Sequence, residues 1–245
     1  MFIKYGEEQH LVSLMNKGDM YFNPCKYFRD LEDVQKRRGI GDGNDGGMVS
    51  EFKNLRMLAS NGEERIAHDS NISLIVEPAL RTPVFCLRKT DTERISNDYR
   101  EKLRFQFPKH THALIIRDES EFKENVRYSL QNKAFAHTVF YETQFMKEFF
   151  DFLKSGSSDI QFYDPKSVGA MYYMEICFRK ADDDNIERLF IDNSNYYKTM
   201  FRKDSFFSDQ CEYRLVLPYE QINAGKAFSI SPFHAELRVI DDLVK

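Results

Sequence analysis

The residues with the clearest chemical potential lie in a short late segment in which polar and apolar side chains alternate. Glu212 and Arg214 alternate there with Tyr213 and Leu215, and Gln210 precedes Glu212 by the same spacing. Because alternate residues of a β-strand point to one side, this pattern places a carboxylate, an amide and a guanidinium on a common face. Such a face predicts a polar binding or catalytic site. The alternative is a solvent-facing strand whose charges form salt bridges.

A second candidate is the aromatic segment of residues 21–30, in which Tyr27 and Phe28 directly precede Arg29. Aromatic rings stack on a base or a nicotinamide ring, and a guanidinium pairs well with phosphate. We therefore predict a nucleotide-binding segment here. The alternative is that both rings are core anchors at helical spacing and that Arg29 pairs with Asp33 one turn later.

A third candidate is the glycine-rich segment of residues 39–47, which contains five glycines together with Asp42 and Asp45. This composition excludes regular structure and fits either a lid over a site or a cation-binding loop, although the distal glutamate of a calcium loop is missing. The alternative is an exposed surface connection. A magnesium-dependent nuclease or phosphotransfer enzyme using Asp42, Asp45 and Glu51 is a further hypothesis, while our main prediction contains no metal site.

The composition of the 245 residues is that of a globular domain. Its hydrophobic fraction is 42%, its charged fraction is 30%, and its 22 phenylalanines occur without any tryptophan. We predict a single domain over residues 1–245, with a core built largely from phenylalanine or a cleft lined by rings. The net charge of −4 argues against constitutive nucleic-acid binding, because phosphate contacts favour a basic surplus.

The usual signatures of several enzyme classes are missing. The sequence has no Gly-x-x-x-x-Gly-Lys-Ser/Thr phosphate loop, no Gly-x-Gly-x-x-Gly turn between a strand and a helix, and neither His-Glu-x-x-His nor Gly-x-Ser-x-Gly. The four cysteines include no Cys-x-x-Cys pair, which argues against structural zinc and favours reduced thiols in the core. No apolar run has the length of a signal peptide or a membrane span, so we expect a cytoplasmic protein without membrane contact.

Short strand-like runs alternate with helical patterns, but without regular βαβ order. This arrangement predicts an α+β fold with mixed, mostly antiparallel sheets that form a split cleft, flanked by several helices. We expect a helix that ends at Gly18, another that Asp118 opens with a capping box, and others at residues 24–38, 92–105, 145–153 and 196–201. Strands are expected at residues 2–5, 20–22, 52–58, 65–67, 72–76, 84–87, 113–116, 138–141, 172–178, 212–217, 228–230 and 237–239.

Taken together, the first and the late segments resemble a known group of proteins. A first strand with Lys4 and Tyr5 is followed by a helix, by the aromatic segment with Arg29, and finally by the Glu212-Tyr213-Arg214 strand. This order resembles small bacterial proteins that have been compared with the ADP-ribosyltransferase superfamily, which includes DNA- and RNA-modifying toxins. The resemblance covers roughly residues 1–45 and 196–217. The superfamily expects His or Arg where this first strand has Lys4 and Tyr5.

The resemblance implies a catalytic set. Members of the superfamily bind NAD as a substrate between two small sheets, and a glutamate on a late strand stabilises the cation that forms as nicotinamide leaves. By this resemblance Glu212 is the catalytic carboxylate and Gln210 orients the acceptor. Tyr141 is the candidate for the residue that a middle strand supplies.

The resemblance also implies a set of NAD-binding residues, in which Arg29 holds the pyrophosphate. This predicted set consists of Lys4, Tyr5, Tyr27, Phe28, Arg29 and Arg214. The implied function is that of a bacterial NAD-consuming transferase which modifies a macromolecule or a nucleotide, as a toxin or in phage defence. The alternative is a non-catalytic module that binds a ligand or a protein on the same scaffold.

Overall fold

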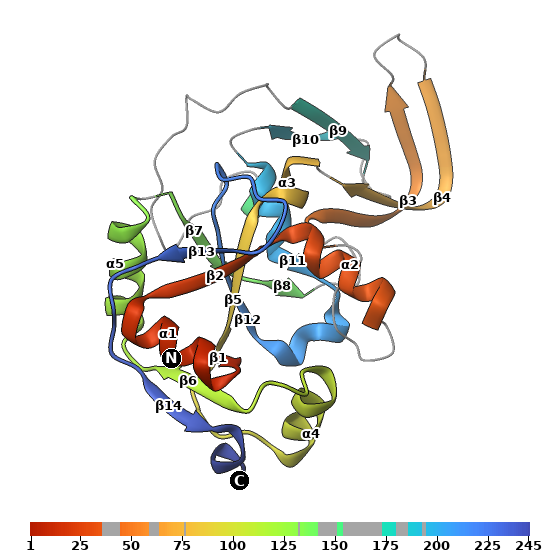
Figure 1. The fold of residues 1–245 in the computed structure, drawn as a ribbon. Helices are drawn as coiled ribbons and strands as arrows, with labels where there is room; N and C mark the ends of the chain where they lie inside the picture. The colour runs from red at the N-terminus through yellow and green to blue at the C-terminus, as the bar shows by residue number, and fades with distance from the viewer. Residues whose placement is uncertain are drawn as a thin grey trace.

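The computed structural model (Figure 1) describes nine ranges of the chain. They are residues 1–35, 45–58, 64–75, 77–131, 133–141, 151–153, 173–179, 186–192 and 195–245. Side chains are described throughout these ranges except at residues 32–35, 48–58, 64–75, 173–179 and 186–192. Most of the expected glycine-rich segment, including Asp42, lies outside the described residues. The same holds for the side chain of Asp33 and for most of the helix expected at residues 145–153.

An eight-stranded antiparallel sheet forms the body of the molecule. Strand β5 is central: β12 lies along one of its edges, while β2 and then β1 share the other edge. The sheet continues from β1 to β6 and β14, from β2 to β13, and from β12 to β7. The strands are β1 (Phe2–Gly6), β2 (Asp19–Pro24), β5 (Pro83–Lys89), β6 (His112–Ile116), β7 (Phe135–Thr138), β12 (Glu212–Val216), β13 (Lys226–Ser229) and β14 (Glu236–Val239).

Three two-stranded sheets accompany the large sheet. Strands β3 (Gly47–Leu58) and β4 (Glu64–Ile75) form a long hairpin that extends away from the body in Figure 1. Strands β9 (Tyr173–Arg179) and β10 (Ile186–Asp192) form a second antiparallel pair. The third pair, β8 (Phe140–Tyr141) with β11 (Arg202–Lys203), is parallel and lies next to the start of β12, as described below.

Eight helices are described, and several begin or end where the sequence has a capping residue. Gly18 ends α1 in the left-handed conformation with φ 71°, and a side chain there would collide with the carbonyl oxygen of Ile230. Ser96 and Asp118 accept hydrogen bonds from the first turns of α4 and α5. The helices are α1 (Glu8–Lys17), α2 (Cys25–Gln35), α3 (Glu77–Arg81), α4 (Asn97–Gln106), α5 (Glu119–Ser129), and the 3₁₀ helices η2 (Tyr196–Phe201), η3 (Ser205–Gln210) and η4 (Ile240–Leu243).

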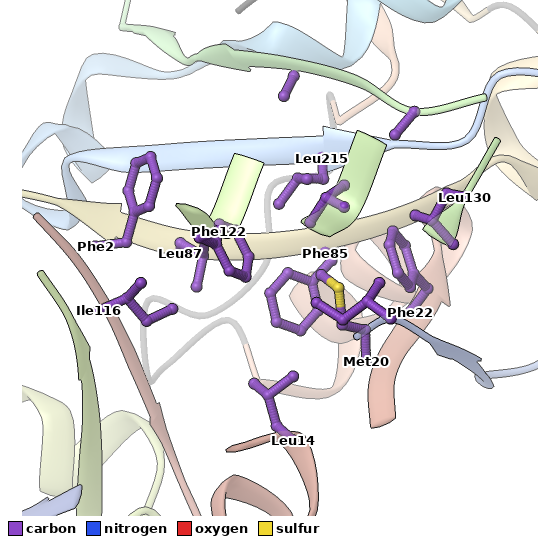
Figure 2. Close-up of a cluster of buried hydrophobic side chains, with 14 of the residues drawn as sticks. Phe2, Leu14, Met20, Phe22, Phe85, Leu87, Ile116, Phe122, Leu130 and Leu215 are labelled. Atoms are coloured by element: carbon purple, nitrogen blue, oxygen red, sulfur yellow. The ribbon is translucent and has the colours of Figure 1, made fainter. Parts of the chain in front are cut away.

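The two faces of the large sheet bury different apolar clusters, because adjacent residues of a strand point to opposite sides. One face packs against α1 and α5, and Figure 2 shows Phe2, Leu87, Phe122 and Leu215 in this cluster. On the opposite face, one cluster packs against η2 and another against α4 and η4. Among the described residues, phenylalanines are buried on both faces together with at least as many leucines, so the core is mixed and is not built largely from phenylalanine.

The predicted α+β class with mostly antiparallel strands is confirmed, and several expected boundaries are corrected. Pro24 ends strand β2 and does not open the following helix, which begins at Cys25. The helix expected at residues 92–105 begins only at Asn97, because the cap that stops its N-terminal extension is Ser96. Gly47 belongs to strand β3 rather than to the glycine-rich segment. In the described part of the chain, no helix combines the length and apolar character needed to cross a membrane.

The cysteines occupy three different environments. Cys25 is fully buried, Cys86 is partly buried, and Cys211 is exposed, so the expectation that every cysteine is a core residue is wrong for Cys211. Its exposure follows from its place at the end of helix η3, where the chain turns into β12. The three thiols are free. The side chain of Cys177 lies outside the described residues.

His110 gives the fold a testable dependence on pH. Burial, assisted by the charge of Lys4, lowers the pKa of His110 to about 4, and its ring stacks on Phe107 at 4.7 Å. The unfolded chain takes up a proton at this histidine below about pH 6.5, whereas the folded chain resists protonation until about pH 4. The contribution of His110 to the free energy of unfolding is therefore fully kept above pH 6.5 and is lost as the pH falls from 6.5 toward 4.

We expect the free energy of unfolding to fall by roughly 2 kcal/mol between pH 7 and pH 5 because of this one group. The His110→Gln variant should lose most of that slope in urea titrations, whereas His234→Gln, at a histidine that is 96% exposed, should keep it. Equal slopes in wild type and His110→Gln would contradict this assignment.

Candidate functional site

Glu212 and Arg214 meet on one face of β12, as the alternation of the sequence predicts. The Arg214 Nε donates to Glu212 Oε1 at 2.9 Å, and Arg214 Nη2 donates to Glu212 Oε2 at 3.2 Å. The side chains are only 1% and 8% exposed. The alternative of a solvent-facing, salt-bridged strand is therefore wrong: the charges pair with each other, but they do so between the two apolar clusters on this face of the sheet.

The other side of the Arg214 guanidinium binds Asp45, which lies just before strand β3. Arg214 Nη1 donates to Asp45 Oδ1 at 2.6 Å and also to the carbonyl oxygen of Met200, while Nη2 donates to Asp45 Oδ2 at 3.3 Å. Arg214 thus holds one carboxylate on each side of its planar fork, a geometry to which arginine is suited. Asp45 has no exposed surface.

Lys203 of strand β11 completes the cluster next to the start of β12. Lys203 Nζ donates to Glu212 Oε2 at 3.0 Å and to Gln210 Oε1 at 2.9 Å. The Tyr141 hydroxyl accepts the backbone N–H of Glu212 at 2.6 Å. Lys203 and Tyr141 are direct partners in the parallel β8–β11 pair, which is how the fold delivers both to Glu212. All three predicted catalytic residues, Glu212, Gln210 and Tyr141, therefore belong to one hydrogen-bonded group.

The electrostatics of this group keep Lys203, Glu212 and Arg214 charged. Burial alone would raise the pKa of Glu212, but the charges of Arg214 and Lys203 outweigh burial and hold that pKa well below its usual range. Burial likewise opposes the charge of Arg214 and of Lys203, and the neighbouring carboxylates of Asp45 and Glu212 outweigh it and raise both pKa values. The result is a buried quartet of two cations and two carboxylates, Asp45, Lys203, Glu212 and Arg214, which we call the charge quartet.

The residue between Gln210 and Glu212 has an unusual backbone. Cys211 has φ 45° and ψ 49°, the left-handed region that side chains with a Cβ atom seldom adopt. This turn ends helix η3 and sets the angle at which β12 begins, so it also places Glu212. Strained backbone of this kind is found at functional sites more often than elsewhere.

We expect Cys211→Gly to raise the free energy of unfolding by about 0.5–1 kcal/mol, because glycine adopts a positive φ without steric conflict. Cys211→Ala retains the Cβ atom and should give no gain, which makes it the matched control. Chemical denaturation of the three proteins measures both effects. A stability of the glycine variant at or below that of the alanine variant would contradict the assignment of strain to this residue.

The predicted NAD-binding pair at the first strand is divided between the two faces of the sheet. Lys4 lies on the face of the α1 and α5 cluster, where its Nζ is 4.3 Å from the centre of the Phe85 ring and donates to the carbonyl oxygen of Cys86 at 2.8 Å. Tyr5 points to the same face as Glu212, toward Tyr99 of α4 at a ring distance of 6.2 Å. Successive strand residues cannot serve one ligand on one face.

The predicted aromatic–arginine segment forms the first turns of α2. Tyr27 is 44% exposed and therefore is not a core anchor, whereas Phe28 packs on the cluster next to η2. Arg29 Nη1 donates to the carbonyl oxygen of Asp45 at 2.9 Å. Arg29 thus reaches the charge quartet through the backbone of one of its members.

Sequence reasoning missed two parts of the site. Lys203 gives no periodic signal, since strand β11 has only two residues. The hypothesis of a cation site made by Asp42, Asp45 and Glu51 does not fit Asp45, because both of its oxygens accept hydrogen bonds from Arg214. Among the described residues, no group of three or more histidine, cysteine, aspartate or glutamate side chains is arranged to hold a metal ion.

Comparisons with known proteins add no family to this picture: no family model, no curated protein and no solved structure matches the chain.

Proposed function

We propose that the chain is an NAD-consuming, ADP-ribosyltransferase-like enzyme whose catalytic carboxylate is Glu212. The observation that supports the proposal is the grouping of Glu212 with Gln210 and Tyr141, which come from segments 71 residues apart. The resemblance names Glu212 and Gln210, and spacing alone suggests Tyr141; the contacts of the three residues bring them to one end of strand β12. The neighbouring cations keep the carboxylate of Glu212 ionised, which is the state that the reaction needs.

In the proposed reaction, the bond between the nicotinamide nitrogen and C1′ of the ribose breaks, and its electron pair leaves with nicotinamide. The ribose becomes an oxocarbenium-like cation, which the Glu212 carboxylate stabilises electrostatically. A nucleophilic atom of the acceptor then bonds to C1′ and releases its proton. The products are the ADP-ribosylated acceptor, nicotinamide and one proton.

Access to Glu212 makes a specific demand on this reaction. Both carboxylate oxygens already accept hydrogen bonds from Arg214, and Oε2 also accepts one from Lys203, whose side chain is 7% exposed. A ribose hydroxyl that approaches Oε2 of Glu212 has to displace the Lys203 side chain. The same observation favours a second candidate function, a non-catalytic ligand- or protein-binding module in which the charge quartet serves only to hold β12, β11 and residue 45 together.

The two functions are separated by incubating the purified protein with NAD, alone and with bacterial lysate, and following NAD and nicotinamide by chromatography. The transferase predicts loss of NAD with release of an equal amount of nicotinamide. A rise in melting temperature with NAD that is not accompanied by any consumption favours the binding module. The absence of both NAD consumption and a rise in melting temperature would contradict the proposed function.

A further inference from the structure

A second polar cluster lies beside Glu212 on the same face of the sheet. Arg88 of β5 is the direct antiparallel partner of Glu212 on one side and of Ile3 on the other. Directly opposed residues of antiparallel strands project to one side with Cα atoms about 5 Å apart. The side chains of Arg88 and Glu212 therefore leave the sheet as neighbours, and Tyr5, two residues after Ile3, leaves it on that face as well.

Arg88 is held in place by an aromatic ring and has no anionic partner among the described residues. Its guanidinium carbon lies 4.1 Å from the centre of the Tyr99 ring, and Tyr99 in turn packs next to Tyr5. In the described part of the chain no carboxylate pairs with Arg88, and its Nη1 atom is buried without a hydrogen-bond partner. Arg214, two residues along β12 from Glu212, differs in that both sides of its guanidinium hold carboxylates. An oriented but unneutralised guanidinium is suited to a phosphate group.

Tyr5 packs next to Tyr99, and Asp209 is close enough to act on Tyr99 electrostatically. Each of these two residues has one buried atom without a partner among the described residues. These atoms are the hydroxyl of Tyr5 and Oδ1 of Asp209, whose other oxygen accepts a hydrogen bond from Lys102. A buried polar atom without a partner destabilises the fold, so a ligand that supplies partners gains affinity. The Tyr5 hydroxyl and the Arg88 guanidinium offer donors to phosphate oxygens, while the free Asp209 oxygen offers an acceptor to a ribose hydroxyl.

The charge around this face is also suited to an anion. The charge quartet is neutral, and Asp209 is paired with Lys102, so no described carboxylate is left to compensate the positive charge of Arg88. A phosphate group placed here would be attracted by Arg88 and would not meet an unpaired carboxylate from the quartet.

We propose that Tyr5, Arg88 and Asp209 form a subsite for the phosphate and ribose of a nucleotide, directly beside Glu212. The choice of a dinucleotide diphosphate as the ligand rests on the function proposed above. This subsite replaces Arg29 as the holder of the pyrophosphate, because Arg29 is engaged with the backbone of Asp45 at the other end of the charge quartet. The subsite places the ribose near Glu212, where its glycosidic bond has to be broken.

The test is isothermal titration calorimetry with ADP-ribose, which carries the diphosphate and both riboses but has no bond to nicotinamide. We expect Arg88→Gln to weaken binding of ADP-ribose at least tenfold. Arg94→Gln removes the same charge from an exposed arginine and should leave the affinity unchanged. Equal affinity of wild type and Arg88→Gln, or no binding of ADP-ribose to wild type at millimolar concentration, would overturn the proposed subsite.

A second variant covers the case in which Arg88→Gln does not fold, as judged by circular dichroism. Tyr5→Phe keeps the ring that packs near Tyr99 and removes only the unpartnered hydroxyl, and we expect it to weaken ADP-ribose binding about threefold to tenfold. Unchanged affinity in Tyr5→Phe would then overturn the subsite.

The subsite and the transferase function fail in different ways. Release of nicotinamide from NAD together with undiminished ADP-ribose affinity in Arg88→Gln overturns the subsite and leaves the transferase standing. Binding of ADP-ribose that depends on Arg88, without any release of nicotinamide, supports the subsite and overturns the transferase.

Discussion

Replacing Arg214 with methionine is expected to lower the free energy of unfolding by about 3–5 kcal/mol. The side chain is 1% exposed and binds Asp45 and Glu212 at once, so its removal takes a cationic partner from two buried carboxylates. Methionine fills a similar volume, which restricts the effect to the lost charge and hydrogen bonds. Urea denaturation followed by circular dichroism measures the change.

The matched control for this prediction is Arg94→Met, at an exposed arginine, where a change within about 0.5 kcal/mol is expected. A double-mutant cycle of Arg214→Met with Asp45→Asn should give a coupling energy above about 1 kcal/mol, since the two side chains are in direct contact. A loss below about 1 kcal/mol for Arg214→Met would show that the charge quartet contributes little to the fold.

The second large effect is expected on activity. Under the proposed function, Glu212→Gln lowers the rate of nicotinamide release by about 100-fold to 1000-fold, because the amide keeps the shape of the side chain but loses the charge that stabilises the ribose cation. The same substitution removes the anion between Arg214 and Lys203, so we also expect a loss of stability of about 1–3 kcal/mol. Assays therefore compare equal concentrations of folded protein at a temperature well below both melting temperatures.

Glu220→Gln is the control for that activity measurement. Glu220 follows strand β12 by four residues and is partly exposed, and the substitution makes the same change of charge and shape. Its rate of nicotinamide release should equal that of the wild type. Equal reductions in the two variants would point to the net charge of the protein rather than to the site of Glu212.

The parts of this site that the sequence predicts are local ones. Glu212 and Arg214 are two residues apart in a strand, so the period of the side chains alone places them on one face. The end of α1 at Gly18 and the start of α5 at Asp118 also follow from single residues, because the capping groups bind the backbone of the adjacent turn.

The parts that the sequence does not reveal depend on contacts between distant segments. Asp45 lies 169 residues from Arg214, and no pattern near either residue indicates that they pair. Lys203 and Tyr141 meet only because two strands of two residues each pair in parallel. Conversely, Lys4 and Tyr5 looked like one binding element in the sequence, yet the alternation of β1 sends them to opposite faces.

The most direct test of the account is the amount of nicotinamide released from NAD by wild-type protein and by Glu212→Gln, measured side by side in bacterial lysate. The account predicts release by the wild type at a rate at least 100-fold above that of the variant, with both proteins folded. Equal release by the two proteins would contradict the catalytic role of Glu212. No release by either, from folded protein, would contradict the transferase function and leave the charge quartet as a structural element of a binding module.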